Sequence, residues 1–341
     1  MSAEPGRGYE RLAELIIGSK IAASLHVVVD KHIADVLASG PKTADALANE
    51  VKIPVDTLRR FMRALTQLGI FTEPDDGVFA NSEVSEYLRS DVKYSLRDMV
   101  RVLDHDVVVR GWQRLPDVLE SGQPAFDEVH GMGFFDWLKA DPDRSAAMAS
   151  FMGGIYGPQG PKIATGYAFG RFETLIDIGG GNGHILAEIL DQHPQLRGAL
   201  FDLPPTADVA RSFLSKRQLA ARWEVFEGDF FTAVPSDYDA YMIKSCLHDW
   251  NDTKAIEILQ RCREAMPAHG RVLIVEIVLG AGRLIGHPHR LIDLEMMVTL
   301  GGRERSQMEF AAILEAAGLK LETVTPIEGS FFSVVEAVAN C

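Results

Sequence analysis

A histidine that directly follows an apolar segment is the residue of this chain best suited to proton transfer. His248 comes after the predicted strand 239–246. Neutral imidazole, with an ordinary pKa of ~6.5, accepts a proton near pH 7. Glu276 closes the next predicted strand, and Glu304 lies in a later glycine-rich turn. A carboxylate on the far ring nitrogen would fix the imidazole tautomer and stabilise imidazolium. The alternatives are a structural histidine, an exposed strand end at Glu276 and a solvated turn charge at Glu304.

A ligand site is indicated by the run Thr174-Leu-Ile-Asp-Ile-Gly-Gly-Gly-Asn-Gly-His184, in which an apolar strand leads through glycines into a predicted helix, 185–190. Glycines such as Gly179 let the backbone turn sharply and approach a ligand closely. The dinucleotide fingerprint G-x-G-x-x-G is not met, because its last position holds His184. Asp177 in the strand end also disfavours a pyrophosphate. The pattern instead favours a ligand with a ribose and an amino-acid tail, namely S-adenosylmethionine, and the alternative is a structural turn without a ligand.

Acidic residues end the next two predicted strands as well. Asp202 follows one of them and is placed to bind a ribose diol. Asp229 follows the other and could accept the adenine amino group, while Phe230 packs on the ring. Each acid taken alone is better explained by a solvated strand terminus than by a ligand contact. Ligands of open α/β sheets bind at the carboxyl ends of strands, so three such ends together favour a cofactor site.

The elements that must position these residues alternate between strand and helix from about residue 170. This order predicts a mostly parallel sheet with right-handed crossovers. The final two strands are separated by Glu328-Gly-Ser and are predicted to pair antiparallel at the sheet edge. The seven predicted strands are 174–178, 197–201, 223–226, 239–246, 271–277, 320–326 and 331–338.

The N-terminal region has the pattern of a winged helix-turn-helix. Apolar residues recur at helical spacing over 9–39, a second amphipathic helix is predicted at 55–68, and 69–79 reads as a two-stranded wing around an Asp-Gly turn. Arg59, Arg60 and Arg63 on the second helix would serve DNA binding. The acidic wing and the acidic chain favour dimerisation or substrate capping instead.

Residues 84–168 are predicted to be mostly helical, with a break at 140–142. This stretch is rich in methionine and aromatic residues, which at helical spacing usually form core. Together with Met297 they also suggest a pocket for a flat apolar ring, for which Phe151 and Met152 are candidates.

Length and composition limit the classes of protein. The chain has 341 residues, which predicts two domains, and a formal net charge of −14, which disfavours nucleic acid as the main partner. No run of 18 apolar residues and no apolar secretory core at the start are present, so a cytoplasmic protein without a transmembrane helix is expected. The three cysteines have neither metal-ligand nor disulfide spacing.

Taken together, these motifs resemble one family over nearly the whole chain: the class I S-adenosylmethionine-dependent O-methyltransferases that include plant caffeic-acid and flavonoid enzymes, acetylserotonin O-methyltransferase and bacterial antibiotic-tailoring enzymes. The resemblance lies in the glycine run, in Gly-Asp-Phe-Phe231, in His-Asp-Trp250 and in Gly-Gly-Arg-Glu-Arg-Ser306. It implies a Rossmann-like α/β domain with a seven-stranded, mostly parallel sheet and an antiparallel edge strand, preceded by a mainly helical, winged-helix dimerisation domain. The implied organisation is 1–100 for dimerisation, 101–168 as a helical linker to the substrate pocket, and 169–341 for catalysis.

The resemblance also assigns residues. It makes His248 the general base, flanked by the acids Glu276 and Glu304, and it places Asp249 beside the substrate. The cofactor positions that it implies are Gly179, Asp202, Asp229, Phe230 and Lys244.

The implied reaction moves a methyl group from a sulfonium to a phenolic or enolic oxygen of a small aromatic acceptor in a homodimeric enzyme. No metal is expected, and His287 and His289 are predicted to lie in or beside a solvated loop. Two alternatives remain: a family member with other chemistry (methylation at carbon or nitrogen, hydroxylation, decarboxylation or a pericyclic step), and a DNA-binding regulator that senses S-adenosylmethionine.

Overall fold

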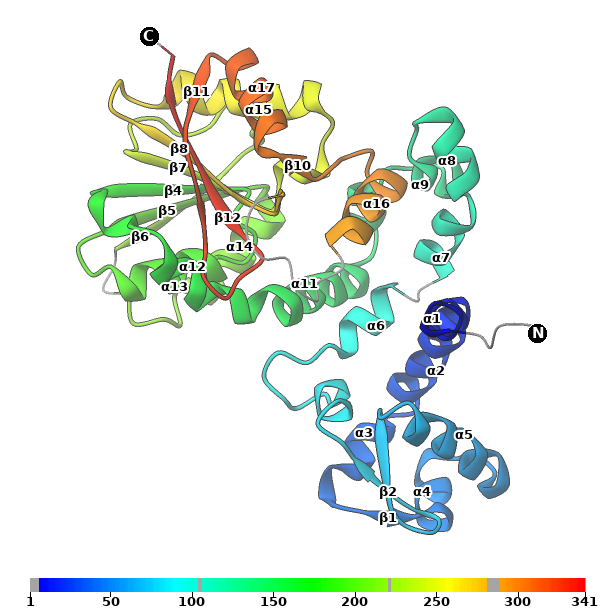
Figure 1. Cartoon of the computed structure of the whole chain (residues 1–341). Coiled ribbons are helices and arrows are strands. Elements are labelled where there is room, and N and C mark those ends of the chain that lie inside the picture. The colour runs from blue at the N-terminus through cyan, green and yellow to red at the C-terminus, as the bar shows by residue number, and fades with distance from the viewer. Residues whose placement is uncertain (1–5, 104–105, 220–221, 281–288, 341) are drawn as a thin grey trace. The chain divides into compact units, whose positions relative to one another are not determined.

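The computed structural model describes residues 6–103, 106–219, 222–280 and 289–340 (Figure 1). They form two compact units, Met1–Val109 with Leu138–Tyr156, and Arg110–Trp137 with Gly157–Cys341. The helical segment 101–168 therefore contributes to both units.

The second unit is built on a seven-stranded sheet of order β11-β12-β8-β7-β4-β5-β6. Neighbouring strands from β8 to β6 pair parallel, whereas β12 pairs antiparallel with both β8 and β11. All seven strands lie where the sequence predicts them, and the predicted antiparallel pair forms the edge. The strands are β4 (Thr174–Ile178), β5 (Arg197–Asp202), β6 (Trp223–Glu227), β7 (Ala240–Lys244), β8 (Arg271–Glu276), β11 (Leu319–Pro326) and β12 (Ser333–Ala339).

Helices cover both faces of this sheet (Figure 1). On one face α15 (Asp252–Ala265) and α17 (Gln307–Ala316) pack apolar side chains such as Leu259 and Phe310 against Ile176 and Ile243. The other face carries α12 (Gly160–Gly166), α13 (His184–Gln192) and α14 (Pro204–Leu214). The central strands of the sheet are buried on both faces, so they appear in the sequence as continuous apolar runs. Short 3-10 turns join these elements at Gly157–Gln159, Phe169–Arg171 and Leu247–Asp249.

A short parallel pair, β9 (Val278–Leu279) with β10 (Arg305–Ser306), extends beyond the end of β8. This pair draws the turn that contains Glu304 back to the end of β8, where Glu276 lies. It was not visible in the sequence because each strand has only two residues.

A small helical layer precedes and follows the sheet in the chain. It consists of α7 (Asp106–Gln113), α8 (Leu115–Ser121), α9 (Ala125–His130), α10 (Phe134–Lys139) and α16 (His289–Thr299). Val118, Ala125 and Val298 form its core, and Trp112 and Met297 pack against that core.

The first unit is mainly helical, with a three-stranded sheet of order β1-β3-β2. The predicted second helix and wing are present as α5, β2 and β3, and Val28, Leu58, Met62 and Phe79 are buried in the core of the unit. The elements are α1 (Arg7–Ile16), α2 (Gly18–Asp30), α3 (Ile33–Val36), the 3-10 turns Leu37–Ser39 and Ser85–Leu88, β1 (Lys42–Thr43), α4 (Ala44–Val51), α5 (Val55–Gln67), β2 (Phe71–Asp75), β3 (Val78–Asn81), α6 (Arg97–Leu103) and α11 (Pro142–Tyr156).

The prediction of one helix over 9–39 is wrong. The chain bends by 46° between α1 and α2, next to the pair Gly18-Ser19, and pairs of small residues of this kind are a usual cause of a kink. A second break follows α2, where His32 has the left-handed φ of 54° and cannot continue a helix. Helical periodicity persists across both breaks, so it did not reveal them.

Among the described helices, no single one has the length and apolar character needed to span a bilayer, although the bent pair α1 and α2 meets those criteria when taken together.

Candidate active site

The glycine run forms a tight turn at the carboxyl end of β4. Gly179 and Gly181 have φ values of +69° and +59°, which only glycine adopts readily. A side chain built on Gly181 would meet no atom within 4 Å, so the backbone of this turn borders open space. Asp202, at the end of β5, accepts the Gly181 N–H at 2.9 Å and the Leu203 N–H at 2.7 Å. Asp202 therefore ties two neighbouring strand ends together.

Phe230 and Asp229 follow β6 at the same edge of the sheet. The Phe230 ring lies 3.6 Å from the position that a Cβ on Gly179 would occupy, and it also packs against Trp250 with ring centroids 6.3 Å apart. Asp229 is exposed and accepts the Phe231 N–H at 2.9 Å. The structure thus brings all the predicted cofactor residues of β4, β5 and β6 to one edge.

Asp177, which is buried, and Lys244, which is half-buried, lie near the carboxyl ends of β4 and β7. Burial raises the pKa of Asp177 to about 7, and the positive charge of Lys244 opposes that rise. Burial likewise lowers the pKa of Lys244 to about 8, against the pull of Asp177. Oδ1 of Asp177 is buried without a hydrogen-bond partner among the described residues. The open glycine turn, the acids and this orphaned oxygen suit a ligand with a ribose, an aromatic base and a positively charged tail.

His248 lies in the 3-10 turn Leu247–Asp249, directly after β7, and is 5% exposed. Its Nδ1 is 2.7 Å from Oε1 of Glu304, and its Nε2 is 3.4 Å from Oδ1 of Asp249. Glu304 is 1% exposed, which excludes a solvated turn charge. The ring therefore has one nitrogen fixed by a buried carboxylate, as the sequence predicts, while the other nitrogen faces the more accessible Asp249.

Glu276 holds the main chain of this turn and is not bonded to the imidazole ring. Its Oε1 accepts the N–H groups of Cys246 and His248, each at 3.1 Å. At 1% exposure it is not an exposed strand end. The backbone just before this turn is strained, since Ser245 has a φ of +46°. Glu276 thus stabilises a local conformation that the chain would not adopt readily.

The surroundings of His248 favour protonation of its ring more strongly than water does. Burial by itself lowers the pKa of His248, but Glu304 and Asp249, with a contribution from Glu276, outweigh burial and raise the pKa to about 10. Burial also raises the pKa of Asp249 to about 7 and raises the pKa of Glu276. The three carboxylates Glu304, Asp249 and Glu276 therefore favour the imidazolium form of His248.

The predicted acceptor residues belong to different parts of the structure. Phe151 and Met152 are half-buried on α11 and belong to the other unit. Met297, on α16, is half-buried against the core of the helical layer. Their role toward an acceptor stays a prediction. His287 lies outside the described residues, and His289 begins α16. No group of His, Cys, Asp and Glu suited to a metal occurs among the residues that the structure describes.

Two functional features near His248 were missed in the sequence. Arg305 is fully buried and contacts the His248 turn, although the motif Gly301-Gly-Arg-Glu-Arg-Ser306 looks like an exposed polar loop. A Cβ on Gly302 would lie 2.0 Å from the carbonyl oxygen of His248, so only glycine fits there. The doubled glycine was the one available signal of such a close approach.

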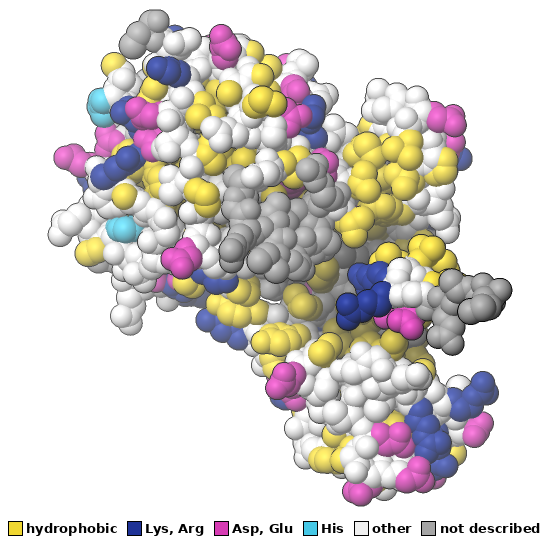
Figure 2. Space-filling view, viewed as in Figure 1, with side chains coloured by type: hydrophobic (Ala, Val, Ile, Leu, Met, Phe, Trp, Pro, Cys, Tyr) yellow, Lys and Arg dark blue, Asp and Glu magenta, His cyan; other side chains and the backbone are white. Residues whose placement is uncertain are grey.

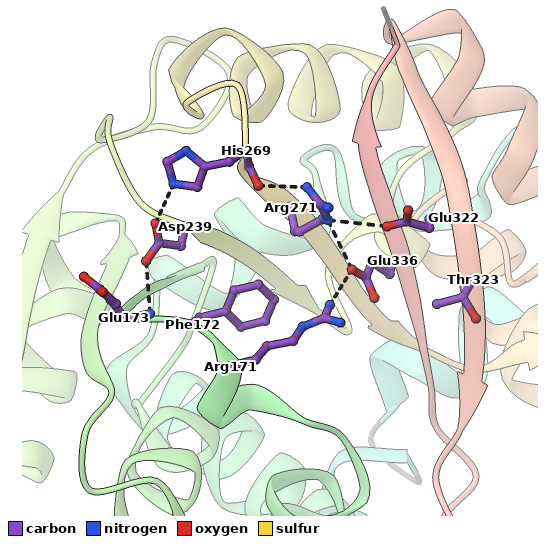
Figure 3. Close-up of a pocket in the computed structure, with 9 residues that line it drawn as sticks. All are labelled: Arg171, Phe172, Glu173, Asp239, His269, Arg271, Glu322, Thr323 and Glu336. Carbon is purple, nitrogen blue, oxygen red and sulfur yellow. Dashed lines mark hydrogen bonds and ion pairs between the residues drawn. The ribbon is translucent and has the colours of Figure 1, made fainter.

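A separate cavity of about 880 Å³ lies near the amino ends of β4, β7 and β8 (Figure 3). Its charged side chains pair with one another: Arg171 with Glu336, Arg271 with Glu322 and Glu336, and His269 with Asp239. The network joins the chain that enters β4 to strand β12, and it shares no residue with the His248 site. The lining residues are Arg171, Phe172, Glu173, Asp239, His269, Arg271, Glu322, Thr323 and Glu336.

The structure has a seven-stranded sheet, a glycine turn after β4, acids after β5 and β6, and a carboxylate-bound histidine after β7. These features define a methyltransferase that uses S-adenosylmethionine. Comparison with known proteins gives the family. The model of the O-methyltransferase domain matches residues 112–320, and that of the O-methyltransferase dimerisation domain matches residues 13–91. The chain belongs to the S-adenosylmethionine-dependent O-methyltransferase family.

Individual relatives cover almost the whole chain. A phenazine O-methyltransferase from Lysobacter antibioticus is 36% identical over 96% of this chain and 95% of its own length. An 8-amino-8-demethylriboflavin N,N-dimethyltransferase from Streptomyces davaonensis is 32% identical over 96% of this chain and 94% of its own length.

Solved structures agree with this result. The mitomycin 7-O-methyltransferase MmcR has a TM-score of 0.89 at 33% identity and covers 97% of this chain and 98% of its own. The O-methyltransferase NcsB1 from neocarzinostatin biosynthesis, in complex with S-adenosylmethionine and 2-hydroxy-5-methyl naphthoic acid, has a TM-score of 0.79 at 34% identity and covers 94% and 96% of the two chains.

Proposed function

We propose that this enzyme methylates a phenolic hydroxyl of a small aromatic molecule in secondary metabolism, with His248 as the general base. The observation that carries the proposal is the position of His248: it follows a central strand beside the glycine turn, and a buried carboxylate lies 2.7 Å from its Nδ1. The named acceptors of relatives, such as a phenazine and a hydroxynaphthoate, are aromatic and support the same class here.

The cofactor supplies an already activated methyl group, so the protein has to align the acceptor oxygen and remove one proton. Glu304 accepts the Nδ1–H of His248 and leaves the Nε2 lone pair to take the acceptor proton. Glu304 then stabilises the imidazolium that forms. A base acts only in its neutral form, so a His248 pKa of about 10 predicts activity that rises toward alkaline pH. Positive charge brought into the pocket would lower that pKa and extend activity toward neutral pH.

The cofactor residues in this proposal are Gly179, Asp202, Asp229, Phe230 and Lys244. Asp202 would bind the ribose diol, Asp229 the adenine amino group, and Phe230 the face of the adenine ring. The support is their common position at the carboxyl ends of β4 to β7.

On the acceptor side, Asp249 would contact the acceptor oxygen from the accessible side of His248. Phe151, Met152 and Met297 would contribute apolar surface for its ring. Glu276 would keep the base in place through the backbone amides that it holds.

The test is a screen for transfer of labelled methyl from S-adenosylmethionine to phenols, flavonoids, quinones and indoles, with mass spectrometry to locate the new methyl group. His248→Ala should lower kcat by ~10²–10⁴-fold and leave the affinity for S-adenosylhomocysteine nearly unchanged. The defect should shrink as the pH approaches the pKa of the acceptor, because the acceptor then ionises without help. Wild-type turnover of the variant on a weakly acidic hydroxyl at pH 7 would refute the base assignment.

Methylation at nitrogen is the second candidate, because one relative of 32% identity is named an N,N-dimethyltransferase. Matched pairs of aromatic amines and phenols in the same screen distinguish the two. A preference for amines that is unaffected by His248→Ala would favour the second candidate.

We also infer that the enzyme is a homodimer assembled through a winged-helix first unit, and that this unit does not bind DNA. The support for dimerisation is α1, which has no buried residue and exposes Tyr9, Leu12, Leu15 and Ile16. Figure 2 shows acidic and basic side chains interspersed over α4 and α5, where a DNA-binding surface would be basic.

Ion pairs partly neutralise two of the three arginines, Arg59, Arg60 and Arg63, that a DNA-binding function would need. Arg63 pairs with Glu73 and Asp76, and Arg59 lies 3.9 Å from Asp45. A mobility-shift assay with random duplex at low salt should show no complex. The cytoplasmic location expected from the sequence belongs to the same proposal, and cell fractionation would test it.

A further inference from the structure

Arg305 is the largest fully buried side chain of the described residues, and its guanidinium forms hydrogen bonds with the segment 247–252, which carries His248. Nη1 donates to the carbonyl of Leu247 at 3.0 Å, and Nη2 donates to the carbonyl of Trp250 at 2.8 Å. Nε and Nη2 also bond Oδ1 of Asp252 at 3.0 and 2.9 Å. One guanidinium therefore binds the main chain both before and after His248.

The residues before Arg305 contact the same segment. The Arg303 N–H donates to the carbonyl of His248 at 2.8 Å, and Glu304 reaches the His248 ring. Gly302 approaches so closely that a Cβ would overlap the His248 carbonyl. Asp293, on α16, accepts the Glu304 N–H at 2.9 Å. The loop 302–305 thus contacts the turn 247–250 at each of its residues. The Glu304–His248 bond lies in the middle of this set of contacts.

We propose that Arg305 is a positioning residue, which holds the turn 247–250 in register with Glu304 so that this carboxylate stays on Nδ1 of the base. This inference rests on the proposed function, in which His248 is the base. Arg305 does not itself reach the ring. Its four bonds fix the backbone that carries the ring, and β10 fixes the backbone that carries Glu304.

A purely electrostatic role for Arg305 and the positioning role predict opposite changes in the pKa of His248 when Arg305 is replaced. Arg305 lowers the pKa of its neighbour Glu276, so it belongs to the charged cluster around the ring together with Glu304, Asp249 and Glu276. If only its charge mattered, removing it would raise the pKa of His248, because a nearby cation disfavours imidazolium. If it positions Glu304, removing it loosens the bond that favours imidazolium and lowers that pKa.

The experiment measures the pKa of His248 by NMR of histidine-labelled enzyme with S-adenosylhomocysteine bound, with His248→Gln identifying the signal. The variants are Arg305→Met, Arg305→Lys, Glu304→Gln and the double variant of Arg305→Met with Glu304→Gln. Arg303→Met is the matched control. Its side chain is 44% exposed, comes from the same turn and also approaches Asp252, but it leaves the carbonyls of Leu247 and Trp250 untouched.

We expect Arg305→Met to lower the pKa of His248 by about 1 and to lower kcat by roughly 10- to 100-fold, with cofactor affinity unchanged. Arg305→Lys should recover part of both losses, since lysine can donate to some of the same carbonyls. The double variant should be no worse than Glu304→Gln alone, because both changes break one contact. Arg303→Met should leave the pKa of His248 unchanged.

A raised pKa in Arg305→Met, additive losses in the double variant, or an equal effect of Arg303→Met would each overturn the proposal. If Arg305→Met does not fold, Arg305→Lys combined with Glu304→Gln tests the same additivity. Amide exchange over residues 246–252 gives a reading that does not depend on the reaction. Faster exchange in Arg305→Met supports the positioning role even if His248→Ala were to show that another group is the base, and unchanged exchange counts against it.

Discussion

Replacement of Glu304 by glutamine tests how the base is activated. The Glu304 side chain is fully buried, and its Oε1 lies 2.7 Å from Nδ1 of His248. Glutamine has the same shape but no charge, so the variant removes the negative partner of the imidazolium while it preserves the packing. Because Glu304 raises the pKa of His248, its neutralisation must lower that pKa.

The expected size follows from the strength of the bond that is lost. Hydrogen bonds to a charged group contribute about 1.5–3 kcal/mol, which corresponds to a fall of about 1–2 in the pKa of His248. The acidic limb of kcat/KM should therefore move to lower pH by that amount. At the alkaline plateau kcat should fall by about 10- to 100-fold, because the imidazolium that forms in the transition state has lost its counter-charge.

The assay is a pH–rate profile from pH 6 to 11 with an acceptor found in the screen, so that the range extends above the His248 pKa of about 10. Glu315→Gln is the control, since Glu315 is exposed on α17 and its side chain makes no hydrogen bond to the His248 turn among the described residues. Calorimetry with S-adenosylhomocysteine would show whether the cofactor site is intact. If Glu304→Gln moves neither the acidic limb nor the plateau, the carboxylate does not act on the base and the reasoning is wrong.

Two further predictions concern the cofactor and the assembly. Asp202→Ala should weaken binding of S-adenosylhomocysteine by ~1.5–3 kcal/mol, because it removes the ribose bonds and also frees the Gly181 N–H. Calorimetry measures the affinity, and Asp208→Ala is an exposed control on α14. Unchanged affinity in Asp202→Ala would refute the ribose assignment. Leu12→Glu combined with Ile16→Glu should give a monomer in light scattering at micromolar concentration. These apolar side chains are 58% and 69% exposed on α1, and exposed apolar surface of this kind marks an interface. A dimer that persists in the double variant would place the interface elsewhere.

The sheet was predictable because its signals are local. Strands buried on both faces appear as apolar runs, and the residues that end them must meet at one edge when the strands are parallel. This reasoning alone brings Gly179, Asp202 and His248 together. The break between α1 and α2 escaped prediction because the apolar spacing continues through it while the direction of the chain changes.

The contacts of His248 were only partly predictable. Glu276 ends a strand next to the strand of His248, so their proximity follows from topology, but its bond to backbone amides does not. Glu304 is 56 residues from His248 and is embedded in polar sequence, so nothing local distinguishes it from a solvated charge. The pKa of His248 depends on how many carboxylates converge after folding, and the sequence alone could not supply that number.

The way the His248 turn is held has a consequence for how the enzyme selects its acceptor. Backbone groups of the turn are bound by Glu276, by the Arg303 amide and by Arg305, all from the sheet domain. A turn fixed from so many directions cannot adapt its geometry to different acceptors. Under the proposed function, we expect differences in acceptor to be accommodated by elements that contribute no bond to the turn, such as the methionine-bearing helix α16. Substitutions there should change which molecule is methylated, whereas substitutions in the turn 247–250 and the loop 302–305 should change how fast any acceptor reacts.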